Sequence, residues 1–316
     1  MKALYFNKFG DNSVLKYGDV DTPQVDNDQI LVKTAYSGLN FADIYRRRGT
    51  YHIEKHKPYI NGYEGLGTVI VLGEKVKNFK LNDKIFFVDV PLANAEYVCV
   101  PVERAIKVPH DLNPELVASI GLQGLTADFL AHDLAQNVLG DRVLIHGISG
   151  GVGQILAQML TADGINVYGV TSTQEKRSLA LKQGAQELFL RNSSWLEDNK
   201  GRFQTVYDGV GKTIEQSLLL TAKRGKVIFY GMAGGNPPQI DLLQLLNQSK
   251  SILTGDLWDY LTDSTQRNAR AQRLFKYFQN NKIQISSPTI FPLSKGKEAY
   301  AYLESGQSTG KVLLKL

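Results

Sequence analysis

The sequence predicts an α/β protein of two domains, a β-rich domain followed by a doubly wound parallel sheet. Three observations carry this prediction: the length of 316 residues, a run of short strand-like segments up to about residue 115, and a regular alternation of strand-like and helix-like segments after Pro109. Because domains usually contain about 100–200 residues, a chain of this length is expected to form two.

The first part of the chain concentrates Val, Ile, Tyr and Phe in short segments that are separated by clusters of Gly, Asn and Asp. This pattern is typical of strands joined by turns. The predicted strands are residues 2–7, 29–37, 67–72, 84–89 and 96–101. They indicate an all-β or β-rich first domain.

After Pro109 the hydrophobic period changes, and two helices are predicted, at residues 113–120 and 125–134. Short apolar runs then alternate with helical stretches, which is the pattern of a parallel sheet with helices between its strands. The predicted strands are residues 142–146, 165–170, 187–190, 206–208 and 226–230, and the helices between them are residues 152–163, 174–183 and 213–222.

The last segment, residues 263–316, contains one polar helix and two strand-like runs, at 288–292 and 311–316. We expect it to return to the first domain. The predicted division is therefore residues 1–117 for the first part of the β-rich domain, 118–258 for the parallel sheet and 259–316 for the returning segment.

Composition indicates an ordinary globular protein, with 43% hydrophobic and 21% charged residues. No apolar run approaches the roughly 18 residues of a membrane span, and the N-terminus lacks the features of a signal peptide. Cys99 is the single cysteine, so no internal disulfide forms. The net charge of +5 comes from Lys and Arg that are interleaved with acids. We therefore expect a cytoplasmic protein with neither a membrane nor a nucleic-acid partner.

The strongest motif is the glycine-rich turn GISGGVG at residues 147–153. A predicted strand precedes it, and an amphipathic helix and a second strand follow within the roughly 30 residues of a βαβ unit. In such a unit the backbone N–H groups and the helix N-terminus bind a pyrophosphate. Gly150, Gly151 and Val152 are the predicted pyrophosphate contacts. Ile148 replaces the first glycine of the strict pattern, so a turn without a ligand is the alternative.

The residues after the second predicted strand favour NADP(H) over NAD(H). NAD-specific sites place an acid at the end of this strand to bind the ribose hydroxyls, but this chain has Val-Thr-Ser-Thr at 170–173. Ser172, Lys176 and Arg191 are the predicted contacts of a 2′-phosphate, because hydroxyl and cationic groups bind phosphate. Glu175 is an acid that would favour NAD(H) instead, but it lies a few positions after the usual place of that acid.

Several motifs occur in order along nearly the whole chain. They are GLNFADIYR at 38–46, GTY at 49–51, PYINGYEG at 58–65, GLTA at 124–127, ISGGVG at 148–153, VYDGVG at 206–211 and TGKV at 309–312. With these motifs the chain resembles the zinc-free quinone oxidoreductase branch of the medium-chain dehydrogenase/reductase superfamily. The resemblance implies a GroES-like substrate domain, a Rossmann cofactor domain, a cleft between them and a homodimer.

The same resemblance predicts a mechanism without metal. Zinc-dependent relatives carry a Cys where this chain has Asn40 and a His where it has Tyr63, and one cysteine cannot form their four-cysteine lobe. A tetrahedral zinc site needs three or four Cys, His or carboxylate ligands. His52 and His56, with Glu54 between them, form a rival zinc motif, but their surroundings indicate a solvated loop.

Hydride addition to an activated alkene or a quinone leaves an enolate or a hydroquinone anion, which needs a hydrogen-bond donor and finally a proton. Tyr45 and Tyr51 are the predicted donors and Asn40 their neutral partner. The resemblance implies that these three line the nicotinamide and substrate cleft, and packing is the alternative role for the tyrosines.

Further cofactor contacts are expected at the end of a later strand and in the GLTA motif. Phe229, Tyr230 and Gly231 should border the nicotinamide, because cofactors bind at the carboxyl ends of parallel strands. Core packing is the alternative for Phe229 and Tyr230. Thr126 is expected beside the cofactor, and Glu64 is expected to brace its domain.

Three functions remain open on the sequence. The first is NADPH-dependent reduction of quinones, and the second is reduction of activated alkenes such as enals or enones. The third, from another class, is an NADPH-binding sensor or binding module with little turnover. Fold alone does not decide the substrate.

Overall fold

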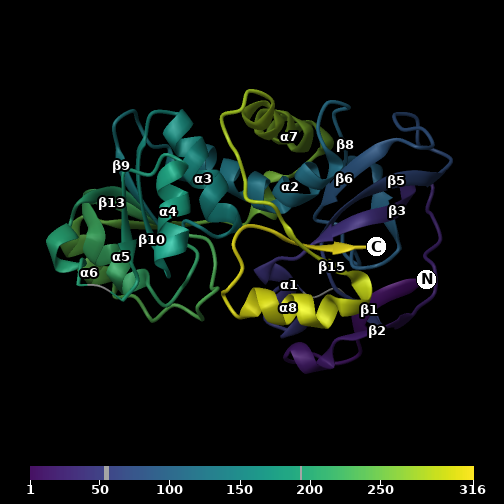
Figure 1. The fold of residues 1–316 in the computed structure, drawn as a ribbon, viewed down its shortest axis with the longest axis horizontal. Coiled ribbons are helices and arrows are strands. Elements are labelled where there is room, and N and C mark those ends of the chain that lie inside the picture. The colour runs from purple at the N-terminus through teal and green to yellow at the C-terminus, as the bar shows by residue number, and fades with distance from the viewer. Residues whose placement is uncertain (53–56, 193) are drawn as a thin grey trace. The chain divides into compact units, whose positions relative to one another are not determined.

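The computed structural model describes residues 1–52, 57–192 and 194–316 (Figure 1). The chain divides into two compact units. Unit 1 comprises Met1–Leu122, Leu261–Ala271 and Ser286–Leu316, and unit 2 comprises Gln123–Tyr260 and Gln272–Ile285. Residues 272–285, which the sequence division assigns to the returning segment, cluster with unit 2.

Unit 1 is a β-rich unit of two sheets. A seven-stranded sheet has the order β15-β16-β3-β5-β6-β8, with β7 paired to β3, and an antiparallel sheet has the order β2-β1-β4. The strands are β1 (Lys2–Phe6), β2 (Lys16–Asp19), β3 (Gln29–Gly38), β4 (Tyr59–Ile60), β5 (Glu64–Leu72), β6 (Lys84–Val88), β7 (Tyr97–Pro101), β8 (Ala105–Lys107), β15 (Thr289–Pro292) and β16 (Val312–Lys315). Helices α1 (Phe41–Arg47) and α8 (Gly296–Glu304) also belong to this unit.

Unit 2 is built on a parallel sheet with the strand order β11-β10-β9-β12-β13-β14. In sequence order this is 3-2-1-4-5-6, the order of dinucleotide-binding Rossmann folds. The strands are β9 (Arg142–His146), β10 (Asn166–Thr171), β11 (Glu187–Leu190), β12 (Phe203–Asp208), β13 (Thr221–Phe229) and β14 (Ser251–Thr254). The helices are α3 (Gly151–Ala162), α4 (Gln174–Lys182), α5 (Ile214–Leu220) and α6 (Leu242–Gln248). The predicted fold class is confirmed.

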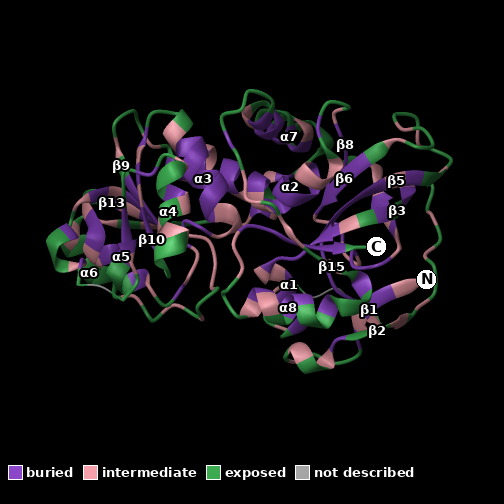
Figure 2. Cartoon of the chain, in the orientation of Figure 1, coloured by how far each residue is buried: buried purple, intermediate pink, exposed green. Residues whose placement is uncertain are grey.

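The central strands of this sheet are apolar along their length because both faces are covered. Leu144, Val206 and Val227 are fully buried in one core cluster, and the strands β9 and β10 are mostly buried in Figure 2. In contrast, α6 contains no buried residue, and it is largely exposed in the same figure.

The helix α2 (Pro114–Phe129) is continuous where the sequence predicts two helices, and a π-helical segment (Leu130–Ala135) follows it. The prediction is wrong because Gly121 and Gly124 do not end a helix here. A Cβ at Gly121 would collide with the Glu64 carboxylate, and one at Gly124 would lie 2.6 Å from a Leu274 methyl. The two glycines therefore allow close packing within a helix.

The predicted C-terminal segment contains more helix than expected. The polar helix is α7 (Ser264–Gln279), but α8 is a second helix that was not predicted, and neither were α1, α6 and β14. Each of these four elements has four to nine residues. In such short segments the hydrophobic period repeats at most twice, so that periodicity alone does not reveal them. No helix in the described part of the chain is long and apolar enough to cross a bilayer.

Candidate functional site

The glycine-rich turn connects β9 directly to α3 in unit 2. Gly147 has a φ of +69°, and Gly150 is the N-cap of α3 with no side chain capping the helix. The first N–H groups of a helix have no intrahelical acceptor. The turn therefore presents the uncapped N-terminus of α3 at the end of β9, next to the point where the strand order reverses.

The glycines of the turn leave no room for side chains on its inner side. A Cβ at Gly153 would collide with the Gly147 carbonyl oxygen, and a Cβ at Gly151 would collide with the Gln123 side chain. On Gly150 a Cβ would meet only the Gly147 oxygen, at 3.2 Å. The predicted contacts Gly150, Gly151 and Val152 thus lie at the start of α3, where the backbone of Gly150 is open.

The predicted 2′-phosphate contacts come together at the ends of β10 and β11. The Arg191 N–H donates to the Thr171 oxygen over 2.9 Å, and α4 begins two residues after Ser172. Burial lowers the pKa of Lys176, and the positive charge of Arg191 lowers it further. Two cations thus follow the neighbouring strands β10 and β11, where positive charge favours the binding of an anion.

The loops after β12 and β13 lie side by side. Tyr230 N–H donates to the Asp208 oxygen over 3.0 Å, and a Cβ at Gly209 would lie 2.6 Å from the Tyr230 ring. The Phe229 side chain packs against the core cluster, as in the packing alternative. Gly231 follows this strand end, and Thr126 is half-buried on α2. The roles of these four residues toward a cofactor stay predictions.

Asp208 anchors the loop after β12, a role that sequence reasoning missed. Its carboxylate accepts hydrogen bonds from the N–H groups of Val210 and Gly211, and from the hydroxyls of Thr213 and Ser217. Asp208 is fully buried. The VYDGVG motif contained the signal, since an Asp that ends a buried strand before Gly-X-Gly is suited to hold the following turn.

In unit 1 Asn40 precedes α1 and is bound on both its backbone and its side chain. Its N–H donates to Asp43 Oδ2 over 2.8 Å, and its Nδ2 donates to Glu64 Oε1 over 2.7 Å. Lys311 Nζ donates to Asn40 Oδ1 over 3.0 Å and also contacts Glu64 Oε1. Asn40 is 6% exposed, so its carboxamide is held in a buried polar network.

Tyr45 and Tyr51 are both half-buried, and their ring centroids lie 6.3 Å apart in an edge-to-face arrangement. The Arg46 guanidinium carbon lies 5.1 Å from the Tyr51 ring centroid and 3.0 Å from that of Tyr63. Arg46 is 4% exposed. The structure thus brings the two predicted proton donors together beside a buried cation, which attracts the faces of aromatic rings.

Asp43, on the same helix as Tyr45 and Arg46, carries a buried carboxyl group. Burial raises its pKa to about 6, although the positive charge of Arg46 opposes the shift. The carboxyl accepts hydrogen bonds from Asn40 and from the Tyr300 hydroxyl, the latter over 3.1 Å. Its other oxygen, Oδ1, is buried and has no hydrogen-bond partner among the described residues. Removing this charge should therefore cost the fold little.

We expect Asp43→Asn to remove a pH dependence of stability between about pH 4 and pH 6. In this window the folded carboxyl still binds a proton that the unfolded one, with its ordinary pKa of 3.8, has lost. The free energy of unfolding therefore falls by roughly 2–3 kcal/mol as the pH rises through the window. Asparagine keeps one oxygen for both hydrogen bonds and does not titrate.

The measurement is the melting temperature of both proteins from pH 4 to pH 7, with the exposed Asp21→Asn as the control. The slope should flatten in Asp43→Asn only, and this variant should be at least as stable as the parent protein at pH 7. An equal slope in all three proteins would show that Asp43 does not titrate in this range.

The positions that bind zinc in metal-dependent relatives carry different side chains here, Asn40 and Tyr63. The Lys311 ammonium lies against both Asn40 and Glu64, where its charge repels a metal cation. Within the described ranges no group of three or more His, Cys, Asp or Glu could hold a metal ion. His52 is exposed, and its proposed partners Glu54 and His56 lie outside the described residues.

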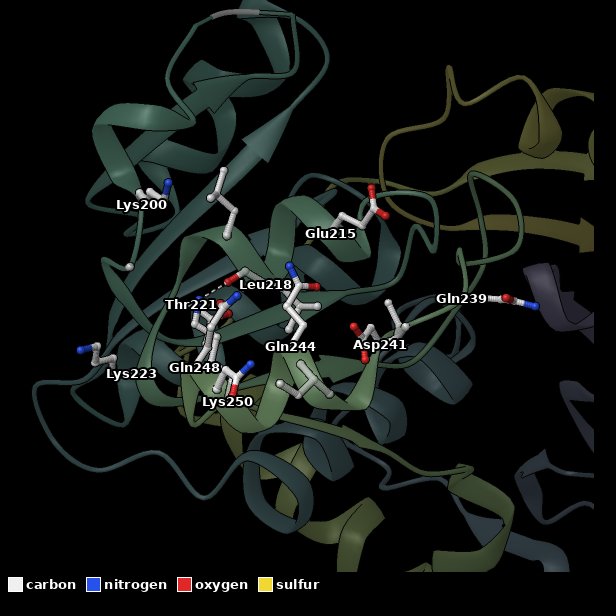
Figure 3. A pocket seen from close by; sticks show the side chains of 15 residues that line it. Lys200, Glu215, Leu218, Thr221, Lys223, Gln239, Asp241, Gln244, Gln248 and Lys250 are labelled. Carbon is white, nitrogen blue, oxygen red and sulfur yellow. Dashed lines mark hydrogen bonds between the residues drawn. The ribbon is translucent and has the colours of Figure 1, made fainter.

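A hollow of about 630 Å³ lies beside α6 in unit 2 (Figure 3). Lys200, Lys223 and Lys250 are among its lining residues, and Asp241, Gln244 and Gln248, labelled in Figure 3, come from α6 and its N-cap. Lys250 Nζ donates a hydrogen bond to the Leu218 carbonyl oxygen over 2.6 Å. None of the predicted site residues lines this hollow, so it is separate from the candidate cofactor site.

Two family models match the chain, in the order of its two folds. An alcohol dehydrogenase GroES-like domain matches residues 26–110, and a zinc-binding dehydrogenase family matches residues 151–267. The second match does not include Asn40 or Tyr63. Its name therefore says nothing about the residues at the zinc-ligand positions.

Similar proteins span the full length of the chain. A probable quinone oxidoreductase of Schizosaccharomyces pombe is 33% identical, over 98% of this chain and 95% of its own. A quinone oxidoreductase of Pseudomonas aeruginosa is 31% identical, over 99% of both chains. A 2-haloacrylate reductase of a Burkholderia species is 30% identical, over 99% of this chain and 98% of its own.

Solved structures of similar proteins also match the chain over its full length. A mycobacterial protein complexed with NADPH has a TM-score of 0.94 at 31% identity, and the matched region covers both chains completely. Escherichia coli quinone oxidoreductase complexed with NADPH has a TM-score of 0.94 at 27% identity, again over both complete chains. The chain is an enzyme that belongs to the quinone oxidoreductase branch of the medium-chain dehydrogenase/reductase superfamily.

Proposed function

We propose that the protein is an NADPH-dependent, zinc-independent reductase of quinones. The observation that carries the choice of cofactor is the position of two cations, Lys176 and Arg191, which follow the paired strands β10 and β11 of unit 2 beside Ser172. An acid that could bind free ribose hydroxyls is absent from residues 170–173. The NADPH complexes of two similar structures support the same cofactor.

Bound NADPH supplies a hydride, and the protein supplies position and polarity. A quinone that accepts the hydride becomes a hydroquinone anion, and one proton from a donor then completes the hydroquinone. In this proposal unit 2 holds the pyrophosphate at Gly150, Gly151 and Val152. In unit 1 either Tyr45 or Tyr51 supplies the proton, while Asn40 donates a hydrogen bond to the oxygen that gains charge. Stepwise transfer of two electrons and a proton would give the same products as transfer of a hydride.

Activated alkenes are the second candidate substrates, and the 2-haloacrylate reductase at 30% identity favours them. Here the hydride would add to the β-carbon of an enal or enone, and the proton would complete the α-carbon. The tyrosine donors serve both reactions, because each reaction produces an oxygen anion or enolate.

A panel assay separates the candidates. The oxidation of NADPH is followed at 340 nm with quinones, enals, enones and 2-haloacrylate, and each acceptor is also tested without protein. Faster oxidation with quinones than with alkenes supports the proposal, and the reverse order selects alkene reduction. If NADPH binds but no acceptor accelerates its oxidation, the protein is a binding module instead.

We also propose that a second copy of the chain joins at β14 and α6. β14 is the last strand of its sheet, so one edge of its backbone pairs with no other strand in the described ranges. The side chains of Leu242, Leu243 and Leu246 are 75%, 67% and 72% exposed. An open strand edge beside exposed leucines is typical of an association surface.

Replacing Leu243 and Leu246 by lysine should therefore convert a dimer into a monomer. Light scattering after gel filtration should give twice the chain mass of 35.1 kDa for the parent protein and the single mass for the variant. Leu139→Lys, at an 82% exposed leucine elsewhere in unit 2, is the matched control and should remain dimeric. A monomeric parent protein, or a dimeric double variant, would refute this surface.

A further inference from the structure

The carboxamide of Asn40 lies between a buried cation and a buried anion. Lys311 Nζ approaches its oxygen at 3.0 Å, and Glu64 Oε1 accepts from its nitrogen at 2.7 Å. The side chains of Lys311 and Glu64 are each 1% exposed, and the two are also in direct contact. The three groups therefore form a closed triangle inside unit 1.

This triangle permits only one orientation of the carboxamide. An amide oxygen accepts hydrogen bonds and the NH2 group donates them, whereas an ammonium only donates and a carboxylate only accepts. A flipped Asn40 would direct its NH2 group at the ammonium and its oxygen at the carboxylate. Both contacts would be repulsive, and burial makes each repulsion stronger than it would be in water.

The orientation leaves one N–H of Asn40 without a strong partner. Of the two Nδ2 hydrogens, one is used by Glu64, and within the described part of the chain the remaining acceptor of this nitrogen is the Gly38 oxygen, at 3.4 Å. The ammonium on the amide oxygen also polarises the carboxamide, which makes this N–H a stronger donor. Asn40 thus holds a pre-oriented donor one residue before α1, the helix that carries Tyr45.

The surrounding backbone is shaped around Lys311 and Glu64. A Cβ at Gly38 would lie 2.7 Å from Lys311 Cε and would collide with the Glu64 carboxylate, as would a Cβ at Gly121. The second carboxylate oxygen of Glu64 accepts the Leu122 N–H at 2.8 Å. Both charged side chains are therefore fixed by contacts other than their own ion pair.

We propose that Lys311 is a positioning residue of the reductase reaction, which, together with Glu64, fixes and polarises the Asn40 carboxamide as a hydrogen-bond donor to the substrate oxygen. This inference rests on the proposed function. Lys311 itself is enclosed and touches no substrate. It acts only through Asn40.

The test replaces the ion pair by neutral groups of similar size, Lys311→Met with Glu64→Gln. Removing both charges avoids an unpaired buried charge, which strongly destabilises a protein. We expect kcat with a saturating quinone to fall about tenfold to a hundredfold, since the loss of one aligned donor has an effect of this order. The dissociation constant of NADPH should change less than twofold, because its predicted contacts lie mainly in unit 2.

Asn40→Ala distinguishes positioning from a merely structural role. It should lower kcat by at least as much as the double variant, and the triple variant should have the same kcat as Asn40→Ala alone. The matched control is Lys295→Met with Glu298→Gln, which removes an exposed ion pair whose Nζ and Oε2 atoms lie 3.3 Å apart. It should keep the parent kcat. Independent, multiplying losses would overturn the proposal.

A readout that needs neither cofactor nor turnover is the side-chain amide signal of Asn40 in protein labelled with 15N-asparagine. Its assignment comes from the Asn40→Ala spectrum. The two hydrogens should differ strongly in chemical shift in the parent protein, because one is bonded to a carboxylate, and the difference should collapse in the double variant. An unchanged signal contradicts the proposal.

If the double variant does not fold, Asn40→Asp tests the donor on which the role of Lys311 depends. Aspartate keeps the contact with Lys311 but has no N–H to donate, so kcat should fall as far as in Asn40→Ala. Turnover at the parent level in Asn40→Asp would refute the inference. A parent protein with which no quinone accelerates the oxidation of NADPH would instead refute the proposed function, so the two failures are distinguishable.

Discussion

Replacing Lys176 and Arg191 by glutamate is expected to lower kcat/KM for NADPH about a hundredfold to a thousandfold. Each hydrogen bond between a charged side chain and a phosphate contributes roughly 1.5–3 kcal/mol, and about 1.4 kcal/mol is a factor of ten. The two glutamates would also repel the 2′-phosphate. NADH has no such phosphate, and an acid near this position can bind its ribose hydroxyls, so activity with NADH should remain or rise.

The measurement is steady-state kinetics with both cofactors and one quinone at saturation. Lys223→Glu with Arg224→Glu, two exposed cations on β13, makes the same change of charge away from the predicted site and should leave the preference unchanged. A parent protein that prefers NADH, or a glutamate variant that still prefers NADPH by the parent ratio, would contradict our assignment of Ser172, Lys176 and Arg191.

Replacing Tyr45 and Tyr51 together by phenylalanine should lower kcat about a hundredfold or more. A positioned general acid contributes roughly 10²–10⁴-fold to a rate, and phenylalanine removes only the hydroxyl. The rings can keep their edge-to-face contact at 6.3 Å and the Arg46 contact on the Tyr51 ring. The loss should therefore reflect chemistry and not packing.

The two single variants show which hydroxyl donates, and the KM for NADPH should hardly change in either. Tyr59→Phe is the matched control, since this half-buried tyrosine of unit 1 stacks on Phe6 with centroids 5.2 Å apart. Unchanged turnover in the double variant would leave both tyrosines as packing residues. The proton would then have to come from another group.

Local patterns were sufficient to predict the parallel sheet of unit 2. The turn at residues 147–153 joins a strand and a helix that both have clear periodicity, and β9 is found at the predicted residues 142–146. β14 and α6 were missed because four and seven residues carry too little pattern. The continuity of α2 was missed because the reason for its glycines, close contact with Glu64 and Leu274, lies far away in the sequence.

The same distinction holds for the site. The cationic pair Lys176 and Arg191 could be predicted because both residues follow recognisable strands. The role of Lys311 could not, since its partner Asn40 is 271 positions away and only the fold of unit 1 joins them. A lysine in a TGKV motif at the end of a chain reads as a surface residue. Its burial becomes intelligible only once Glu64 is known to lie beside it.

The most direct test of the central claim is a single turnover of the enzyme with bound NADPH, followed at 340 nm after a quinone is added. We expect the absorbance to fall in one phase, with one NADP⁺ formed per site, and we expect deuterium at the transferred position of the nicotinamide to slow this phase. A decay no faster than that of free NADPH with the same quinone would contradict the account.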